Sequence, residues 1–170
     1  MKKLACKAFV LVAGALIVPC AIAASPGPKP ENRDTAALRT LWNSYQQAVA
    51  RKDATALLGM YASGDVPVIG AFAPKSYAVV TAANKQPVPR TLSSTAKESV
   101  AGEVRLPPDQ TENLRIESDG EVGSVSWDYR ASVGHGRLIW TTVHTNDGWK
   151  ISSVVYSINV PAADKANIPG

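Results

Sequence analysis

The chain has 170 residues, 45% of them apolar and 19% charged, with 18 Lys and Arg against 14 Asp and Glu. This length and composition suit one folded domain with its own core and exclude a wholly disordered chain. The formal charge of +4 includes Lys2, Lys3 and Lys7 of an expected leader, and without them 15 basic residues balance 14 acidic ones, a net of +1. No clustered basic face remains, so the composition argues against a protein that binds nucleic acid through its phosphates.

The first 23 residues have the pattern of a secretory signal peptide. Met1-Lys2-Lys3 is a short positive start, residues 4–18 are mostly apolar, and Ala21-Ile22-Ala23 has the small-x-small pattern that signal peptidase cleaves. The apolar run is shorter than the about 20 residues that a membrane span needs. We therefore expect cleavage after Ala23 and a bacterial periplasmic or secreted protein with no membrane contact afterwards. An uncleaved anchor is the alternative.

Both cysteines, Cys6 and Cys20, lie in this leader, so the mature chain is expected to have none. That excludes thiol catalysis and Cys-based zinc sites from the mature protein. Cys20 also permits a lipid anchor, although Pro19 stands where such anchors normally have Gly, Ala or Ser. With two histidines and no H-E-x-x-H, phosphate-cradling or dinucleotide motif, we expect no metal and no cofactor.

The N-terminal part of the mature chain is expected to be a Pro-rich tether over residues 24–33, followed by two helices. The first helix is predicted from Asp34 to near Lys52, with Asp34 or Thr35 as its cap and apolar residues at helical spacing. Asp53 is predicted to cap a second, short helix. These elements open a folded domain that we place at residues 34–160.

The middle of the chain is harder to interpret. Residues 66–72 are β-branched and apolar and predict a strand, with Pro67 at its start or on a sheet edge. Residues 73–102 give weaker signals: a possible strand around Tyr77 to Thr81, and a helical turn at Thr95-Ala96-Lys97-Glu98, which has the spacing of a capping box.

The C-terminal third is predicted to form strands over residues 112–117, 122–133, 138–145 and 149–160. The segments 118–120, 134–136 and 146–148 are predicted turns, because each contains Gly between alternating runs. The result is an antiparallel meander after two helices, which is an α+β order. Residues 161–170 form a polar tail.

This order of elements resembles the nuclear transport factor 2-like superfamily, especially its SnoaL-like bacterial branches. The resemblance rests on residues 41–49 followed by Lys52-Asp53-Ala54, and on Asp119-Gly120-Glu121-Val122 and Asp147-Gly148-Trp149-Lys150-Ile151. It covers residues 34–160 except 73–102. It implies a cone-shaped, curved antiparallel sheet wrapped around the N-terminal helices, with an apolar cavity at the open end. Family enzymes place acids, a Tyr or a His there, many members have no known reaction, and the fold commonly dimerises through its sheet.

Six residues are candidates for the cavity wall. The alternation over residues 125–133 puts Trp127 and Tyr129 on the apolar strand face, and the spacing from Leu138 puts His144 on the face of Trp140. Core packing is the alternative for the aromatic residues, and a surface imidazole is the alternative for His144. The predicted ligand-binding residues are Tyr45, Tyr61, Trp127, Tyr129, Trp140 and His144.

Three functions remain open. The first is binding of a small apolar molecule, with no chemistry required. The second is an isomerase, dehydratase or cyclase that uses His144 as proton carrier and a Tyr hydroxyl. The third is a homodimeric assembly module without ligand. An enzyme has few acids to use, since Asp65 fits a turn and Asp128 an exposed strand face, and residues 152–156 lack the His that many SnoaL-like chains carry.

Overall fold

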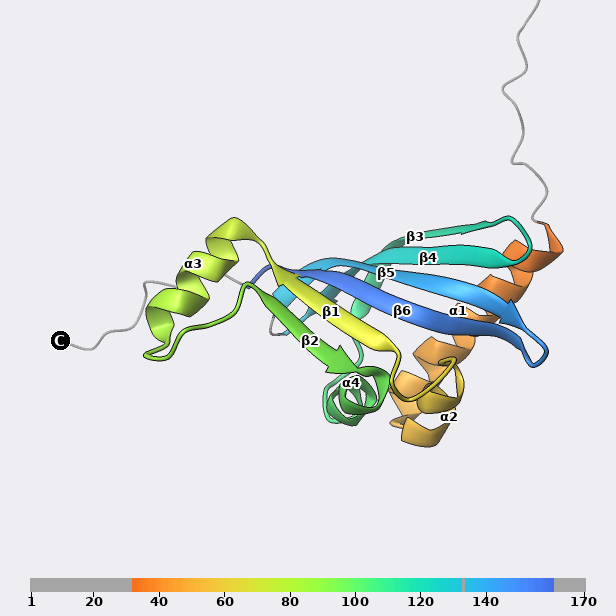
Figure 1. The fold of residues 1–170 in the computed structure, drawn as a ribbon, viewed down its shortest axis with the longest axis horizontal. Helices are drawn as coiled ribbons and strands as arrows, with labels where there is room; N and C mark the ends of the chain where they lie inside the picture. The colour runs from red at the N-terminus through yellow and green to blue at the C-terminus, as the bar shows by residue number, and fades with distance from the viewer. Residues whose placement is uncertain (1–31, 133, 161–170) are drawn as a thin grey trace, which may run out of the picture. The chain divides into compact units, whose positions relative to one another are not determined.

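The computed structural model of the protein describes residues 32–132 and 134–160; the expected leader, most of the tether and the tail lie outside the described residues. Within these residues, four helices lie among the first six elements, and the last four elements are strands that follow one another (Figure 1). The elements are α1 Arg33–Arg51, α2 Ala54–Gly59, β1 Pro67–Phe72, α3 Pro74–Ala83, β2 Thr91–Thr95, α4 Ala96–Glu103, β3 Gln110–Ser118, β4 Val122–Ala131, β5 Gly134–Thr145 and β6 Gly148–Ile158.

The six strands form one curved sheet in the order β2-β1-β6-β5-β4-β3. Neighbouring strands are antiparallel, except that β1 lies parallel to β6, with Gly70 opposite Tyr156. The last strand of the chain is therefore an inner strand of the sheet. The predicted α+β class, with a curved sheet against N-terminal helices, is confirmed.

The two N-terminal helices begin and end at residues that favour those boundaries. Asn32 caps α1 by accepting from the backbone N–H of Asp34 at 2.8 Å and of Thr35 at 2.9 Å. The prediction that Asp34 or Thr35 is the cap is therefore wrong by two or three residues. Lys52 ends α1 in the left-handed conformation, and Asp53 caps α2 as predicted, accepting from Ala56 at 2.9 Å.

Residues 73–102 form a helix, a strand and a second helix. The strand predicted around Tyr77 to Thr81 is wrong, because Pro74 opens α3 there and the Tyr77 hydroxyl donates to the Val88 carbonyl at 2.9 Å. Strand β2 was not predicted. The capping box is confirmed: Glu98 N–H donates to Thr95 Oγ1 at 3.2 Å, and Thr95 N–H donates to Glu98 Oε2 at 2.9 Å.

The C-terminal strands follow the predicted meander with one correction. The Asp-Gly turns are confirmed, and Gly120 and Gly148 both have the positive φ that such turns require. The turn predicted at Gly134-His135-Gly136 is wrong, since these residues begin β5. Gly136 lies so close to β6 that a Cβ there would clash with the Ser157 carbonyl oxygen. A glycine at this position therefore allows β5 and β6 to approach each other closely.

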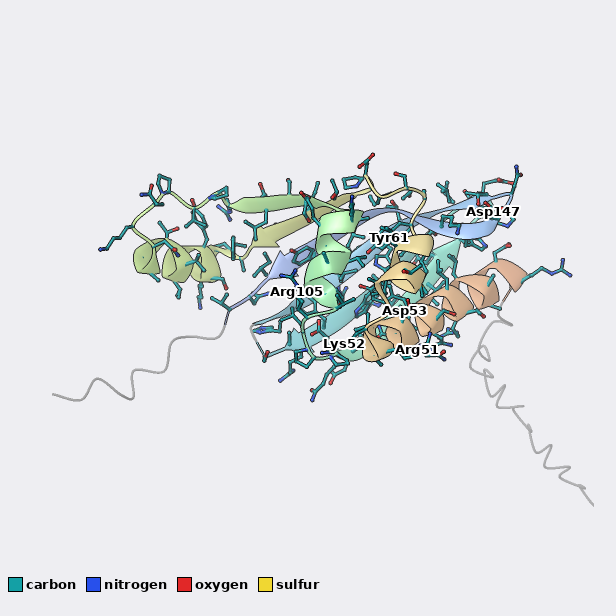
Figure 2. All side chains as sticks on the ribbon, turned by 90° about the horizontal axis from the view of Figure 1, so that it is seen from below. Arg51, Lys52, Asp53, Tyr61, Arg105 and Asp147 are labelled. Atoms are coloured by element: carbon teal, nitrogen blue, oxygen red, sulfur yellow. The ribbon has the colours of Figure 1, made fainter. Side chains whose placement is uncertain are left out.

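Helices α1, α2 and α4 cover one face of the sheet, and Figure 2 shows the molecule from this side. Helix α3 connects β1 to β2 and lies away from the other three helices. The core lies between these helices and the sheet. Its largest fully buried side chains include Trp140, Leu38, Leu57, Ile151 and Val125. Among the described residues, no helix is both long and apolar enough to span a membrane.

Candidate functional site

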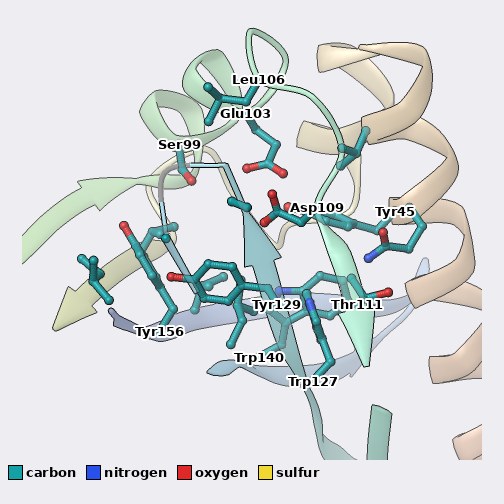
Figure 3. A pocket seen from close by; sticks show the side chains of 18 of the residues that line it. Tyr45, Ser99, Glu103, Leu106, Asp109, Thr111, Trp127, Tyr129, Trp140 and Tyr156 are labelled. Atoms are coloured by element: carbon teal, nitrogen blue, oxygen red, sulfur yellow. The ribbon is translucent and has the colours of Figure 1, made fainter. Parts of the chain in front are cut away.

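A pocket of about 310 Å³ opens on the helix-covered face of the sheet (Figure 3). Its wall combines residues of α1, α4 and the strands, so segments far apart in the sequence meet there. The structure places five of the six predicted wall residues around it: Tyr45, Tyr61, Trp127, Tyr129 and Trp140. Whether they bind a ligand stays a prediction.

Aromatic rings form the floor of the pocket and meet nearly at right angles. The Trp127 and Trp140 ring centroids lie 4.7 Å apart at 88°, and those of Tyr45 and Trp140 lie 4.9 Å apart at 73°. Edge-to-face pairs of this kind stabilise one another beyond their buried area. The rings therefore belong both to the core and to the pocket wall. Core packing and a place in the cavity wall, which the sequence leaves as alternatives, both apply to these residues.

The tyrosines are held by their hydroxyls and by the backbone. The Tyr129 hydroxyl donates to the Ser157 carbonyl at 2.9 Å, and burial raises its pKa to about 12. Tyr61 is fixed by flanking backbone bonds to Ile151, and its side chain lies close to that of Tyr45. Burial raises the pKa of both Tyr45 and Tyr61, so all three are neutral hydrogen-bonding groups at physiological pH.

Tyr156, which the sequence analysis did not select, completes the aromatic wall. It lies on β6 over Gly70 of β1, and a Cβ at Gly70 would stand only 2.6 Å from Tyr156 Cζ. Its ring centroid lies 6.5 Å from that of Tyr129. The parallel β1–β6 pairing therefore creates this part of the pocket, and no local sequence signal reveals it.

Two carboxyl groups lie at the pocket, from a segment to which the sequence analysis assigned no site. Glu103 is the last residue of α4, and Asp109 follows Pro107-Pro108 before β3. Figure 3 shows both side chains directed into the pocket with their carboxyl groups near each other. Burial raises the pKa of both, and the charge of Asp109 raises that of Glu103 further.

The two carboxyl groups have no counter-charge inside the site. Within the described part of the chain, neither makes a hydrogen bond or ion pair, and no Lys, Arg or His lines the pocket. Their effect extends to the tyrosines: after burial, the charge of Glu103 raises the pKa of Tyr61 and of Tyr156. The pocket is therefore apolar at its floor and acidic on one side.

His144 lies elsewhere, and its predicted place in the cavity wall is wrong. It is exposed near the end of β5, where its ring stacks on Trp149 with centroids 5.1 Å apart at 30°. Leu38, Val125 and Ile151 fill the space between helix and sheet at that end. The surface imidazole weighed as the alternative describes His144, so a proton carrier in the pocket has to be another group.

The acids weighed from the sequence lie outside the pocket. Asp128 accepts from Arg137 Nε at 2.8 Å and from Asn113 Nδ2 at 2.7 Å, and these bonds lower its pKa. Asp65 is exposed in the segment before β1. Within residues 32–132 and 134–160, no group of three or more His, Cys, Asp or Glu side chains could hold a metal ion.

No family model and no curated protein matches the chain. The comparison with known proteins therefore rests on solved structures. An NTF2-like protein of unknown function from Shewanella baltica OS155 aligns with a TM-score of 0.56 at 13% identity, covering 75% of this chain and 94% of that one. An NTF2-like protein of unknown function from Silicibacter pomeroyi DSS-3 gives 0.54 at 18% identity, with 73% and 94% covered.

A cystatin-like fold protein from Burkholderia xenovorans LB400 gives a TM-score of 0.51 at 14% identity, covering 75% of this chain and 93% of that one. Identities this low establish architecture and leave the activity open. The helices, the curved sheet and these alignments agree: the chain has the fold of the nuclear transport factor 2-like superfamily.

Proposed function

We propose that this protein binds a small, largely apolar molecule in the pocket between α1, α4 and the sheet. One observation carries the proposal: an aromatic-floored cavity of about 310 Å³ with polar groups gathered on one side. Ligand sites in proteins are usually apolar clefts of about 300–1,000 Å³ with a few directed polar groups. A packed core would have filled this volume with side chains.

The pocket is tested with the purified protein and a panel of small apolar metabolites. A ligand present at a hundred times its Kd stabilises the folded state by about 2.7 kcal/mol, so binding raises the melting temperature. Ala131→Phe fills the pocket and is expected to abolish the shift. Arg130→Phe, the neighbour on the opposite face of β4, is the matched control and keeps it. Loss in both variants, or in neither, contradicts the proposal.

A second candidate function is proton transfer on a bound carbonyl compound. Its support is the Glu103 carboxyl, which is directed into the pocket (Figure 3) and whose pKa is raised by burial and by Asp109, the direction that favours a general base. Glu103 takes the role that the sequence analysis gave to His144, and the Tyr156 hydroxyl is available as a donor. The test is exchange of substrate C–H hydrogen for solvent deuterium. Glu103→Gln is expected to abolish exchange while ligand binding persists, and unchanged exchange overturns this function.

Export and self-association complete the proposal. An exported protein is expected in the periplasm or medium with Ala24 as its first residue, and mass spectrometry of the mature chain tests this. A cytoplasmic chain that retains Met1 contradicts it, and a lipid on Cys20 would identify the anchored alternative.

A homodimer would use the outer sheet face. Ile139 of β5 and Val155 of β6 lie opposite each other there, 41% and 45% exposed. Ile139→Lys is expected to convert a dimer to a monomer in sedimentation experiments, whereas Thr91→Lys at the sheet edge is not. A wild-type monomer at high concentration contradicts this part.

A further inference from the structure

We propose that the ligand of this pocket is an organic cation, a small apolar molecule that carries an amine. The inference rests on the proposed function, because it names the chemical class of the same ligand. Three features of the wall support it: its negative charge, its aromatic rings and the indole N–H of Trp127.

The charge of the wall is negative and is not balanced from within. Glu103 and Asp109 contribute two carboxyl groups, and the remaining lining residues carry no cationic side chain. Arg105, two residues after Glu103, is exposed and does not line the pocket. Glu103 also ends α4, where the aligned peptide dipoles place partial negative charge. A cation in the pocket supplies the counter-charge that the chain does not.

The acidic character extends across the pocket from both sides. Asp109 contributes, after burial and Tyr156, to the raised pKa of Tyr129, and Glu103 contributes to that of Tyr156. On the opposite wall both acids contribute to the raised pKa of Tyr45. The titratable groups facing the two carboxyls are thus tyrosines that stay neutral at physiological pH. A neutral ligand would leave the carboxyls partly desolvated and uncompensated, whereas an ammonium group forms charge-assisted hydrogen bonds to them.

The aromatic residues suit the same ligand. An ammonium group within about 6 Å of a Trp or Tyr ring face is attracted by the ring quadrupole, most strongly by Trp. Trp127, Trp140 and Tyr45 line the pocket as nearly buried rings that meet at steep angles, and the half-buried rings of Tyr129 and Tyr156 add more accessible aromatic surface. The pocket thereby offers both a carboxyl pair for the charge and aromatic surface for the apolar body.

Trp127 supplies an independent indication that the pocket receives a ligand. Its side chain is only 3% exposed and lines the pocket, and its indole N–H, which makes no hydrogen bond within the described residues, borders the open volume of the pocket. Figure 3 shows this side chain directed toward the side where Asp109 and Tyr129 lie. An indole N–H that borders a pocket can donate to whatever fills it, so a ligand with an acceptor beside its amine would take this hydrogen bond in place of water.

Three probes with the same apolar body separate charge from hydrophobicity. Isothermal titration at pH 7 compares 4-phenylbutylamine, 4-phenyl-1-butanol and 5-phenylpentanoate, which are cationic, neutral and anionic. The amine is expected to bind at least about tenfold more tightly than the alcohol, the size of one charge-assisted contact. The carboxylate is expected to bind more weakly than either.

Charge-removing variants then locate the effect. Glu103→Gln with Asp109→Asn is expected to reduce amine affinity to that of the alcohol while alcohol affinity changes less than about threefold. Asp65→Asn with Glu112→Gln removes the same net charge from exposed positions outside the pocket and should leave amine affinity unchanged. Comparable loss in this control pair assigns the effect to overall charge and overturns the inference.

The outcomes distinguish the inference from the function on which it rests. Equal binding of amine and alcohol overturns the cation and leaves an apolar ligand in the pocket. Preferential binding of the carboxylate also overturns it. No binding of any probe at millimolar concentration, with the fold intact by circular dichroism, overturns both proposals.

Discussion

The two ends of the helix-facing side of the sheet differ in how they are completed. The closed end is defined by Leu38, Val125, Thr142 and Ile151. It is tightly packed, since none of these residues is more than 1% exposed. The pocket end, defined by Glu103, Asp109, Tyr129 and Tyr156, keeps an open volume beside two desolvated carboxyls. Both ends are built on the same strands, so the sheet alone does not determine which end becomes a site.

What separates the two ends is the element that covers each of them. The long helix α1 covers the closed end with Leu38, whereas at the pocket end its residues Tyr45 and Val49 share the covering with the eight-residue α4 and the segment that follows it. A short covering helix leaves strand surface uncovered and places its own terminus at the opening. The stability of the molecule is thus expected to come from one end and its binding from the other.

The largest expected effect is at the closed end. Leu38→Ala removes a fully buried side chain and leaves a cavity, so the free energy of unfolding should fall by about 2–5 kcal/mol. Leu106→Ala at the pocket, where the side chain is 45% exposed, should cost less than about 1 kcal/mol. Urea unfolding measures both, and equal losses would remove the distinction between the two ends.

Gly70→Ala tests the close approach that holds Tyr156 in the wall. The added methyl group would stand 2.6 Å from Tyr156 Cζ and 2.9 Å from Ile158 Cδ1, so the ring must move, at an expected cost of about 1–3 kcal/mol. Tyr156→Ala in the same chain should relieve part of this cost, which a double-mutant cycle measures. Additive effects would mean that the two residues do not constrain each other.

Thr142→Val is expected to stabilise the closed end. The Thr142 hydroxyl is buried, with the side chain 1% exposed, and has no hydrogen-bond partner in the described part of the chain. Valine has nearly the same shape without the polar atom, so the free energy of unfolding should rise by about 1 kcal/mol. Thr142→Ser keeps the hydroxyl and serves as the comparison. A less stable valine variant would show that the hydroxyl has a partner in solution.

The smallest expected effect is the pH dependence of the acidic side. A raised folded-state pKa means that the contribution of Glu103 is fully present below its unfolded pKa of about 4.3 and is lost as pH rises through the folded value. Glu103→Gln cannot ionise, so it should gain stability relative to wild type between about pH 4 and pH 7, by about 1 kcal/mol or less.

Asp128→Asn should change in the opposite direction and in a lower pH range, below the unfolded Asp pKa of about 3.9. The hydrogen bonds from Arg137 and Asn113 lower the Asp128 pKa, so this carboxyl contributes stability that is present above its unfolded pKa and lost as pH falls. Urea unfolding of both variants at pH 3, pH 4 and pH 7 gives the two signs: relative to wild type, Glu103→Gln gains stability from pH 4 to pH 7, and the deficit of Asp128→Asn shrinks from pH 4 to pH 3. Parallel behaviour of the two would contradict the assignment of desolvation at the pocket.

The elements predicted correctly from the sequence are those that neighbouring residues determine. The helical spacing of α1, the Asp53 cap and the Asp-Gly turns need only local chemistry. The strand predicted at residues 77–81 was wrong because their β-branched composition favours a strand. In the structure, Pro74 begins a helix there, and the hydrogen bond from Tyr77 to Val88 stabilises it. Tertiary contacts outweigh propensity in such segments.

The candidate site was predicted only for its aromatic floor. Alternation along β4 identifies the face that carries Trp127 and Tyr129, because every second residue of a strand shares a face. The acids were missed because the approach of Glu103 and Asp109 depends on where α4 ends and how the chain returns to β3. His144 was misplaced because strand alternation gives a face but not a position along it, and the pocket occupies only one end.

The position of β6 has a consequence for how the molecule is assembled. It joins the β1–β2 hairpin to the β3–β4–β5 meander, so the two halves of the sheet share no backbone pairing until residues 148–158 have been made. The β1–β6 pairing joins residues about 85 positions apart in the chain, and such distant pairing slows folding. Shortening the chain from its C-terminus into this strand would leave two separate fragments of sheet, neither with a complete pocket.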